Sequence, residues 1–125
     1  MNLSLDTHVL LWWLADDPLL AASARRAIMN SRNLVIVSAV VIWEIRIKQA
    51  IGKIEIDPSF FEVIRQQGFE MLSITAEHAY AVGDLPVHHR DPFDRMIIAQ
   101  AQLEGLTIAT HDPLFTQYGI SVLHC

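Results

Sequence analysis

Short apolar segments alternate along this chain with segments of helical character, and this alternation constrains the fold more than any other feature. Residues Leu34–Val37 form an unbroken, β-branched apolar run, which is typical of a strand buried on both faces. Strands that alternate with helices predict an α/β fold, in which helices cover both faces of a mainly parallel sheet. Ligands in such folds bind beyond the carboxyl ends of the strands, so we look for functional residues there.

The pattern predicts elements along the whole chain. The expected strands are Asn2–Leu5, Leu34–Val37, Met71–Ile74, Leu106–Ala109 and Ile120–Leu123. The expected helices are Thr7–Ala15, Ser23–Ser31, a helix from the N-cap Ser38 through Ile51, Pro58–Gln67, Ala76–Asp84, a helix that follows Asp91, and Pro113–Tyr118. The 125 residues contain no repeat or linker, so we expect one domain, residues 1–125.

Composition limits the partners that the chain can have. The net charge is −5, whereas a protein that binds nucleic acid by charge alone should be basic. Either nucleic acid is not the partner, or metal ions mask some of the carboxylates. The most apolar run, Leu34 to Trp43, is about half of the ~20 residues that a membrane helix needs, and the N-terminus lacks the features of a signal peptide. Cys125 is the only cysteine, which fits a reducing compartment, and we expect a cytoplasmic protein.

Several aspartates lie where strands end and helices begin. Asp6 follows the first strand directly, and Asp112 follows the fourth strand. Asp91 is the expected N-cap of the helix that follows it, and Asp94 lies three residues further, on the same helical face. Each of these aspartates can be a cap, and each also has a position suited to a reacting group. The sequence alone leaves both roles open.

Glu44 lies among apolar residues in the segment SAVVIWEIRIKQAIG. Glutamate is seldom buried unless it is paired or bound to a metal, so Glu44 either pairs with Lys48 four residues on or faces a functional site. The carboxylates of Asp6, Glu44, Asp94 and Asp112 can meet at one end of a parallel sheet. Such a group repels itself unless it is protonated or bridged by a cation. Oxygen ligands suit Mg²⁺ or Mn²⁺, and such sites perform phosphoryl chemistry.

These residues resemble the acidic motifs of PIN-domain ribonucleases, and more narrowly those of the VapC toxins of type II toxin–antitoxin systems. The resemblance rests on LDTHVLLWWL, SAVVIWEI, HHRDPFDRMIIAQA and IATHDPLF, and it covers nearly the whole chain in order. It implies a three-layer α/β/α fold and a Mg²⁺- or Mn²⁺-dependent endoribonuclease. It implies metal binding or water activation by Asp6, Glu44 and Asp94, with Asp112 as a fourth acidic group. It also implies a cognate antitoxin and a homodimer.

Further residues have a possible supporting role beside an ordinary structural one. Asp91, Thr7, Ser38 and Thr110 either hydrogen-bond to ligands of the metal or cap helices and turns. Arg90 and Arg95 are candidates for binding RNA phosphate, with a structural salt bridge as the alternative for Arg95. We expect His88 and His89 to be a solvated loop pair. Trp12 and Trp13 cannot share one side of a helix, so one of them is available to a dimer or antitoxin interface.

Other phosphoryl-transfer classes fit the sequence less well. Haloacid-dehalogenase phosphatases need a second aspartate two residues after the first, and His8 stands there. A receiver domain needs a lysine after a late strand, and THDPLF contains none. The alternative from a different class is a non-catalytic PIN-like module that binds protein or RNA. Metal binding without cleavage would identify that alternative.

Overall fold

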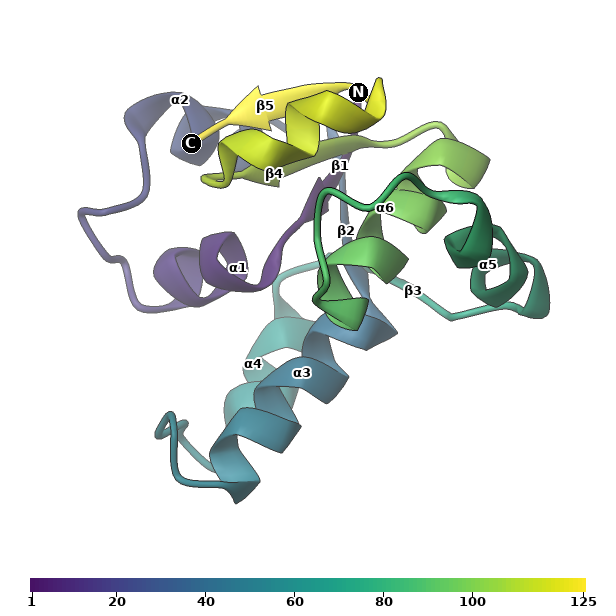
Figure 1. The fold of residues 1–125 in the computed structure, drawn as a ribbon. Coiled ribbons are helices and arrows are strands. Elements are labelled where there is room, and N and C mark those ends of the chain that lie inside the picture. The colour runs from purple at the N-terminus through teal and green to yellow at the C-terminus, as the bar shows by residue number, and fades with distance from the viewer.

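The computed structural model describes all of residues 1–125, and a five-stranded sheet forms its centre (Figure 1). The strands are β1 (Asn2–Leu5), β2 (Leu34–Ser38), β3 (Glu70–Leu72), β4 (Thr107–Thr110) and β5 (Val122–His124). They lie in the order β3-β2-β1-β4-β5, and every neighbouring pair is parallel. The predicted α/β fold with a parallel central sheet is therefore confirmed.

Helices connect the strands. They are α1 (Thr7–Leu14), α2 (Ala22–Met29), α3 (Ala39–Ala50), α4 (Phe60–Gln66), α5 (Ala76–Ala81) and α6 (Pro92–Glu104), with 3-10 helices η1 (Val82–Asp84) and η2 (Pro113–Tyr118). Most of their ends lie within one or two residues of the prediction, but the fourth and fifth helices are each three residues shorter than predicted. The fourth begins at Phe60 because the Asp57 carboxylate accepts a hydrogen bond from the Ser59 amide and holds a turn there. The fifth changes to a 3-10 turn at Val82, whose carbonyl accepts from Arg95.

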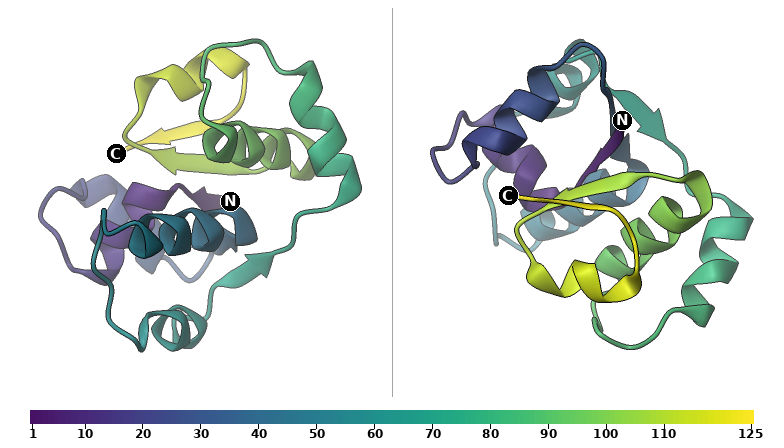
Figure 2. Two further views of the ribbon diagram at one scale, coloured as in Figure 1. Left: turned by 60° about the horizontal axis from the view of Figure 1, so that its bottom comes forward. Right: turned by 90° about the horizontal axis from the view of Figure 1, so that it is seen from above.

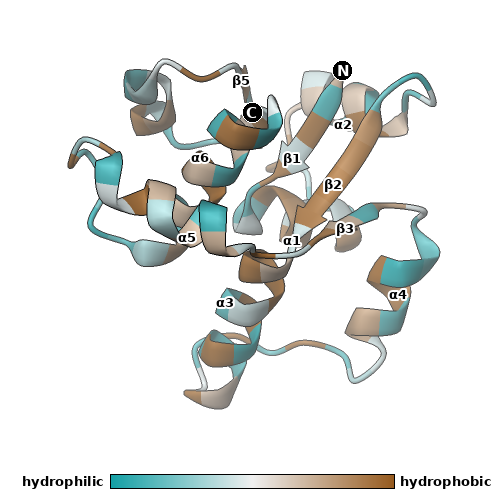
Figure 3. Cartoon of the chain, turned by 90° about the vertical axis from the view of Figure 1, so that its right-hand side faces the viewer, coloured by the Kyte–Doolittle hydropathy of each residue, from teal (hydrophilic) through white to brown (hydrophobic).

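The sheet lies between two layers of helices. Helices α1 and α2 cover one face, and α6 and η2 cover the other (Figure 2). Strand β2 is apolar along most of its length, as expected for a strand covered on both sides (Figure 3). The core between the layers contains Leu3 and Leu5 of β1, Ile108 of β4, and Ile97 and Ile98 of α6. Burying each such aliphatic side chain contributes about 1.5–3 kcal/mol, and this packing fixes where the strands end.

The strand order reverses between β1 and β4. The chain leaves β1 toward β2 on one side, while β4 pairs with β1 on the other side. Open parallel sheets bind ligands in the crevice at such a point. Helix α3 starts at the end of β2 and contacts both α1 and α6, so it closes this region from below in Figure 1. None of the helices has the length and apolar content that a membrane crossing requires.

Candidate active site

A cavity of about 170 Å³ lies where the strand order reverses. Its lining residues come from four separate parts of the chain: Asp6, Thr7, His8, Glu44, Lys48, Asp91, Asp94, Asp112 and Phe115. All four aspartates and glutamates predicted to be catalytic are among them, together with the predicted supporting residues Thr7 and Asp91. We call this space the acidic cavity. Carboxylates from distant parts of the sequence therefore share one small volume.

Asp6 is held at the end of β1 by hydrogen bonds to both of its carboxylate oxygens. One oxygen accepts from the Val9 amide at 2.9 Å, so Asp6 caps α1, and the other accepts from the Thr110 hydroxyl. Burial raises the pKa of Asp6 above its ordinary value, although the bonds from Thr110 and Val9 act in the opposite direction. Asp6 is thus both the cap of α1, as predicted, and a wall of the acidic cavity.

Glu44 pairs with Lys48, which is one of its two predicted alternatives, and it also lines the acidic cavity. Its side chain is buried in the first half of α3, where the Thr7 hydroxyl donates to one carboxylate oxygen. The other oxygen pairs with the Lys48 ammonium at 3.0 Å, one helical turn further on. Both Glu44 and Lys48 line the acidic cavity, so the pair does not turn away from it. Lys48 is the only lysine or arginine in this lining, and it offsets part of the negative charge.

Asp91 and Asp94 enter the cavity from the start of α6. Asp91 caps the helix, since its carboxylate accepts from the Phe93 amide at 2.8 Å. The carboxylate of Asp94 accepts no hydrogen bond from the protein. Burial, together with the charges of Asp91, Glu44 and Asp6, raises its pKa from 3.8 to about 7 against a lowering by the charge of His89. Asp94 is therefore a carboxylate whose negative charge no hydrogen bond of the protein stabilises.

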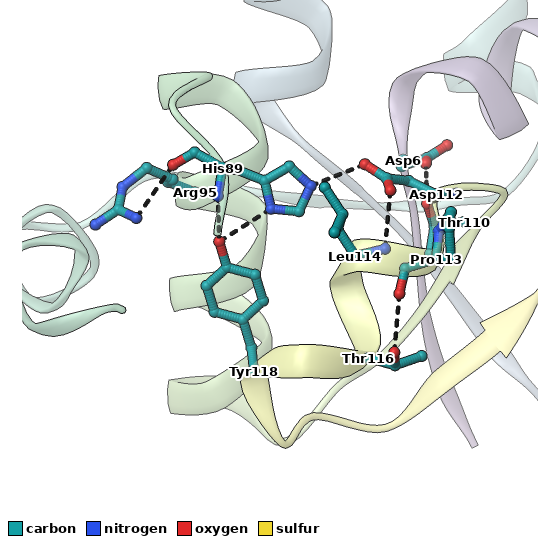
Figure 4. Close-up of polar contacts among 9 residues, drawn as sticks. All are labelled: Asp6, His89, Arg95, Thr110, Asp112, Pro113, Leu114, Thr116 and Tyr118. Carbon is teal, nitrogen blue, oxygen red and sulfur yellow. Dashed lines mark hydrogen bonds and ion pairs between the residues drawn. The ribbon is translucent and has the colours of Figure 1, made fainter. Parts of the chain in front are cut away.

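Asp112 belongs to a network that the sequence did not predict (Figure 4). One of its oxygens accepts from the Leu114 amide at 2.9 Å and caps η2, and the other lies 2.8 Å from His89 Nε2. The opposite ring nitrogen of His89 lies 2.9 Å from the Tyr118 hydroxyl, which also accepts from the His89 amide. Burial would raise the pKa of Asp112, but the bonds from His89 and Leu114 outweigh it and hold the pKa below its ordinary value.

The prediction that His88 and His89 form a solvated loop pair is wrong for His89. His88 is exposed, but the His89 ring is buried and stacks on Tyr118 with its edge toward Phe115. The neutral tautomer with a proton on Nε2 satisfies the whole network, because Nε2 then donates to Asp112 and Nδ1 accepts from Tyr118. His89 thereby fixes the orientation of one wall of the acidic cavity.

The remaining predicted residues lie outside the lining of the cavity. Arg95 donates to the carbonyls of Pro86, Val82 and Leu85 at 2.9–3.2 Å and forms no salt bridge, so its guanidinium fastens the loop before α6. Arg90 is exposed and makes no hydrogen bond through its side chain, so it is free to meet a ligand. Ser38 caps α3 by accepting from the Val40 amide, which is the structural alternative predicted for it.

The donor set of the cavity fits a divalent cation. Single ligand atoms of His89, Asp94 and Asp112 lie within 4.8 Å of one another. Asp6 and Glu44 add further carboxylate oxygens to the same lining. An oxygen-rich site of this kind suits Mg²⁺ or Mn²⁺ better than zinc, and a cation there would stabilise the ionised forms of Asp6 and Asp94, whose pKa values burial raises. The nitrogen of His89 is already engaged with Asp112, so it is better suited to hold that ligand than to bind the metal itself.

The sequence was compared with models of protein families and with curated proteins. A family model described as the PIN domain matches residues 3–120. No curated protein sequence matches the chain.

Solved structures with the same fold cover nearly the whole chain. A chain of VapBC2 from Rickettsia felis bound to promoter DNA is similar with a TM-score of 0.76 at 16% identity, over 100% of this chain and 99% of that chain. DNA-bound VapBC from Salmonella typhimurium gives a TM-score of 0.72 at 21% identity, over 99% and 98%. A toxin–antitoxin complex from Klebsiella pneumoniae gives 0.64 at 17% identity, over 96% and 94%. At these identities the likeness shows the fold.

Proposed function

The chain belongs to the PIN-domain family, and from this premise we propose that it is a metal-dependent endoribonuclease that acts as the toxin of a toxin–antitoxin pair. The proposed reaction is hydrolysis of an RNA phosphodiester bond at the acidic cavity. The similar solved structures are VapBC and other toxin–antitoxin complexes, which supports a cognate antitoxin as the partner. The groove lined by Ile42, Phe61 and Met71 beside the edge strand β3 offers an apolar surface for such a protein or for a second copy in a homodimer.

The main support for this proposal is the environment of the Asp94 carboxylate. It lies in a cavity with four other carboxylates and accepts no hydrogen bond that would stabilise its charge. A pKa of about 7 means that its ionised form is costly in the absence of a cation. A folded protein that needs only a capped helix gains nothing from this arrangement. A divalent cation removes the cost, and this supports a metal site formed by Asp6, Glu44, Asp94 and Asp112.

A bound Mg²⁺ or Mn²⁺ would supply charge for the phosphate and acidify a water molecule for attack. The chain's own residues hold the ligands in place. Thr110 fixes one oxygen of Asp6, and Thr7 fixes one oxygen of Glu44, so neither carboxylate can rotate freely. His89 does the same for Asp112. Such positioning lowers the reorganisation needed during the reaction.

Two cations of the chain have separate roles in this proposal. Lys48 balances Glu44 inside the cavity and is close enough to attract a phosphate group to it. Arg90 projects from the loop before α6 without an internal partner, so it can bind an RNA phosphate outside the cavity. Arg95 was predicted as a second RNA contact, but its donors are used by carbonyl groups of the protein. We therefore assign phosphate binding to Arg90.

Cleavage of a pool of structured RNAs tests the proposed function. The purified protein is assayed with Mg²⁺, with Mn²⁺ and with a chelator, beside the variants Asp94→Asn and Asp57→Asn. Asp57 is exposed and lines none of the cavities described, so its variant removes the same charge elsewhere. We expect metal-dependent cutting by the wild type and by Asp57→Asn, and a loss of about 100-fold or more in Asp94→Asn.

Two results would reject the assignment. Equal cutting by Asp94→Asn and the wild type would mean that the activity comes from another site or from a contaminant. Calorimetric binding of Mn²⁺ without cleavage of any RNA would favour the non-catalytic PIN-like module. Binding that is lost in Asp94→Asn would still place the metal in the acidic cavity.

A further inference from the structure

A second cavity, of about 310 Å³, opens beside the acidic cavity. It is lined by Asp6, His8, Trp12, His111, Asp112 and Pro113. The two cavities share Asp6, His8 and Asp112. Its size is at the lower end of the range for small-ligand pockets, so it suits a single flat group better than a large one. We call it the aromatic pocket.

Three rings face one another around the aromatic pocket. The ring of His8 lies 5.9 Å from that of Trp12, tilted by 35°, and His111 meets Trp12 edge-on at 5.7 Å. Two of these rings come from α1, and His111 comes from the loop after β4. His8 and His111 are exposed and Trp12 is half-buried, so the pocket is open to solvent. Flat faces and polar ring edges in this arrangement fit a planar heteroaromatic group.

The two neighbouring tryptophans of α1 have different surroundings. Trp13 donates its indole N–H to Gln67 at the end of α4, at 3.1 Å, and so belongs to the packing of that layer. Trp12 makes no side-chain hydrogen bond and turns toward the cavity that contains Asp6. The sequence predicted that one of the two tryptophans is available to a dimer or antitoxin interface, and no contact in the structure tests that prediction. Of the two, Trp12 is the one that lies beside the candidate active site.

We propose that the aromatic pocket binds one unpaired nucleobase of the RNA, stacked on Trp12, while the adjacent phosphate lies at the acidic cavity. This inference rests on the proposed function. The base and the phosphate of one nucleotide lie close together. The two cavities are also adjacent, since Asp6, His8 and Asp112 line both of them. A base can reach such a pocket only when it is unpaired, so the substrate class is single-stranded or looped RNA.

The charge of the protein favours a contact that does not depend on phosphate. With a net charge of −5 and Lys48 as the only lysine or arginine in the lining of either cavity, attraction to phosphates supplies little of the affinity for RNA. Stacking of a base on an aromatic ring does not depend on net charge and tolerates any base. The pocket therefore supplies affinity and sets the position of the cut relative to an unpaired base.

The test measures binding of a short, fluorescein-labelled, single-stranded RNA pool of random sequence by fluorescence anisotropy. Ca²⁺ replaces Mg²⁺, and the RNA is checked on a gel afterwards. The variants are Trp12→Leu, which keeps apolar bulk without a π-face, Trp12→Phe, which keeps an aromatic face, and the neighbouring control Trp13→Leu. We expect Trp12→Leu to bind about 5- to 100-fold more weakly than the wild type, and the other two variants to bind within about 3-fold of it.

A second probe of the same length without bases separates stacking from folding. We expect this abasic strand to bind equally to the wild type and to Trp12→Leu, with unchanged circular dichroism in the variant. Equal binding of the RNA pool to the wild type and Trp12→Leu, or an equal loss for both probes, would overturn the pocket assignment while leaving the nuclease in place. If the wild type neither binds nor cuts RNA, the proposed function itself is wrong.

Discussion

Replacing Asp94 by asparagine should stabilise the metal-free protein, although it removes a residue that we assign to the active site. Burial and three neighbouring carboxylates raise the pKa of Asp94 from 3.8 to about 7 in the folded state. An unfolded chain releases the proton near the ordinary value. The folded state therefore becomes less stable as the pH rises from about 4 to about 7, and the full penalty is present above about pH 7.

The size of the effect follows from the two pKa values. The difference between 3.8 and about 7 corresponds to about 4 kcal/mol in the free energy of unfolding. Because the Asp94 side chain is half-buried and water screens part of its field, we take about half of this value, about 2 kcal/mol. For a domain of this length, such a gain raises the melting temperature by about 6–10 °C. Asparagine is nearly isosteric with aspartate and carries no charge, so the folded variant does not bear the cost of a buried negative charge.

Urea and thermal unfolding in the presence of a chelator measure this difference at about pH 4 and about pH 8. We expect Asp94→Asn to exceed the wild type in stability at the higher pH and to match it at the lower pH. Saturating Mn²⁺ should reverse the order, because an ion at 100 times its dissociation constant stabilises the wild type by about 2.7 kcal/mol and has a weaker site in the variant.

Asp57→Asn is the matched control, and it should change the free energy of unfolding in the opposite direction. Hydrogen bonds from Ser59 lower the pKa of Asp57, so its charge stabilises the fold above the ordinary pKa and that contribution is lost as the pH falls. Asp57→Asn should therefore be slightly less stable than the wild type at the higher pH. The reasoning about Asp94 would be refuted if Asp94→Asn were no more stable than the wild type under chelation, or if its advantage did not depend on pH.

Three further predictions concern residues around the acidic cavity. His89→Ala should lower RNA cleavage by about 10-fold or more because Asp112 loses its orientation, and should cost about 1–3 kcal/mol in urea unfolding because buried polar groups lose a partner; unchanged kcat would contradict this role. Arg95→Lys should speed hydrogen exchange of the loop before α6, since one ammonium cannot serve three carbonyls in a fixed fork, and unaltered protection there would count against the contact. Lys48→Met should tighten Mn²⁺ binding about 10-fold in calorimetry by removing a competing cation from Glu44, whereas weaker binding would mean that Lys48 organises the site.

The fold was predictable because the buried strands consist largely of apolar residues, which can be recognised in the sequence. The run Leu34–Val37 is apolar at every position, and the structure places it as β2 between two other strands. Helix ends were predictable where an aspartate or serine caps them locally, as at Asp6, Ser38 and Asp91. The change to a 3-10 turn at Val82 was not predicted, and the carbonyl of Val82 accepts a hydrogen bond from Arg95, which lies 13 residues further along the chain. A local pattern cannot indicate a contact that forms only in the folded protein.

The difference between local patterns and contacts that form only on folding also applies to the candidate active site. That Asp6, Asp94 and Asp112 lie in one cavity could be predicted from the sequence, because strand ends and helix starts fix where they lie. The pair formed by Glu44 and Lys48 could also be anticipated, from a spacing of four residues on one helix. His89 could not, since its partners Asp112 and Tyr118 are 23 and 29 residues away. The sequence showed only that His89 lies just before the capped start of α6. A histidine in such a loop can be buried or exposed, so this position did not predict its burial.

Capping explains how the cavity keeps its shape before any cation binds. Asp6 and Asp112 each use one oxygen to cap a helix and the other to bond a side chain, Thr110 or His89. These bonds offset part of the cost of bringing carboxylates together, because each stabilises the ionised form. Asp94 alone lacks such support, although α6 is anchored in the core by the buried side chains of Ile97 and Ile98. The fold thus fixes the position of Asp94 through α6 and leaves its charge to be satisfied by a ligand, so metal affinity and metal-free stability must change in opposite directions when this residue is altered.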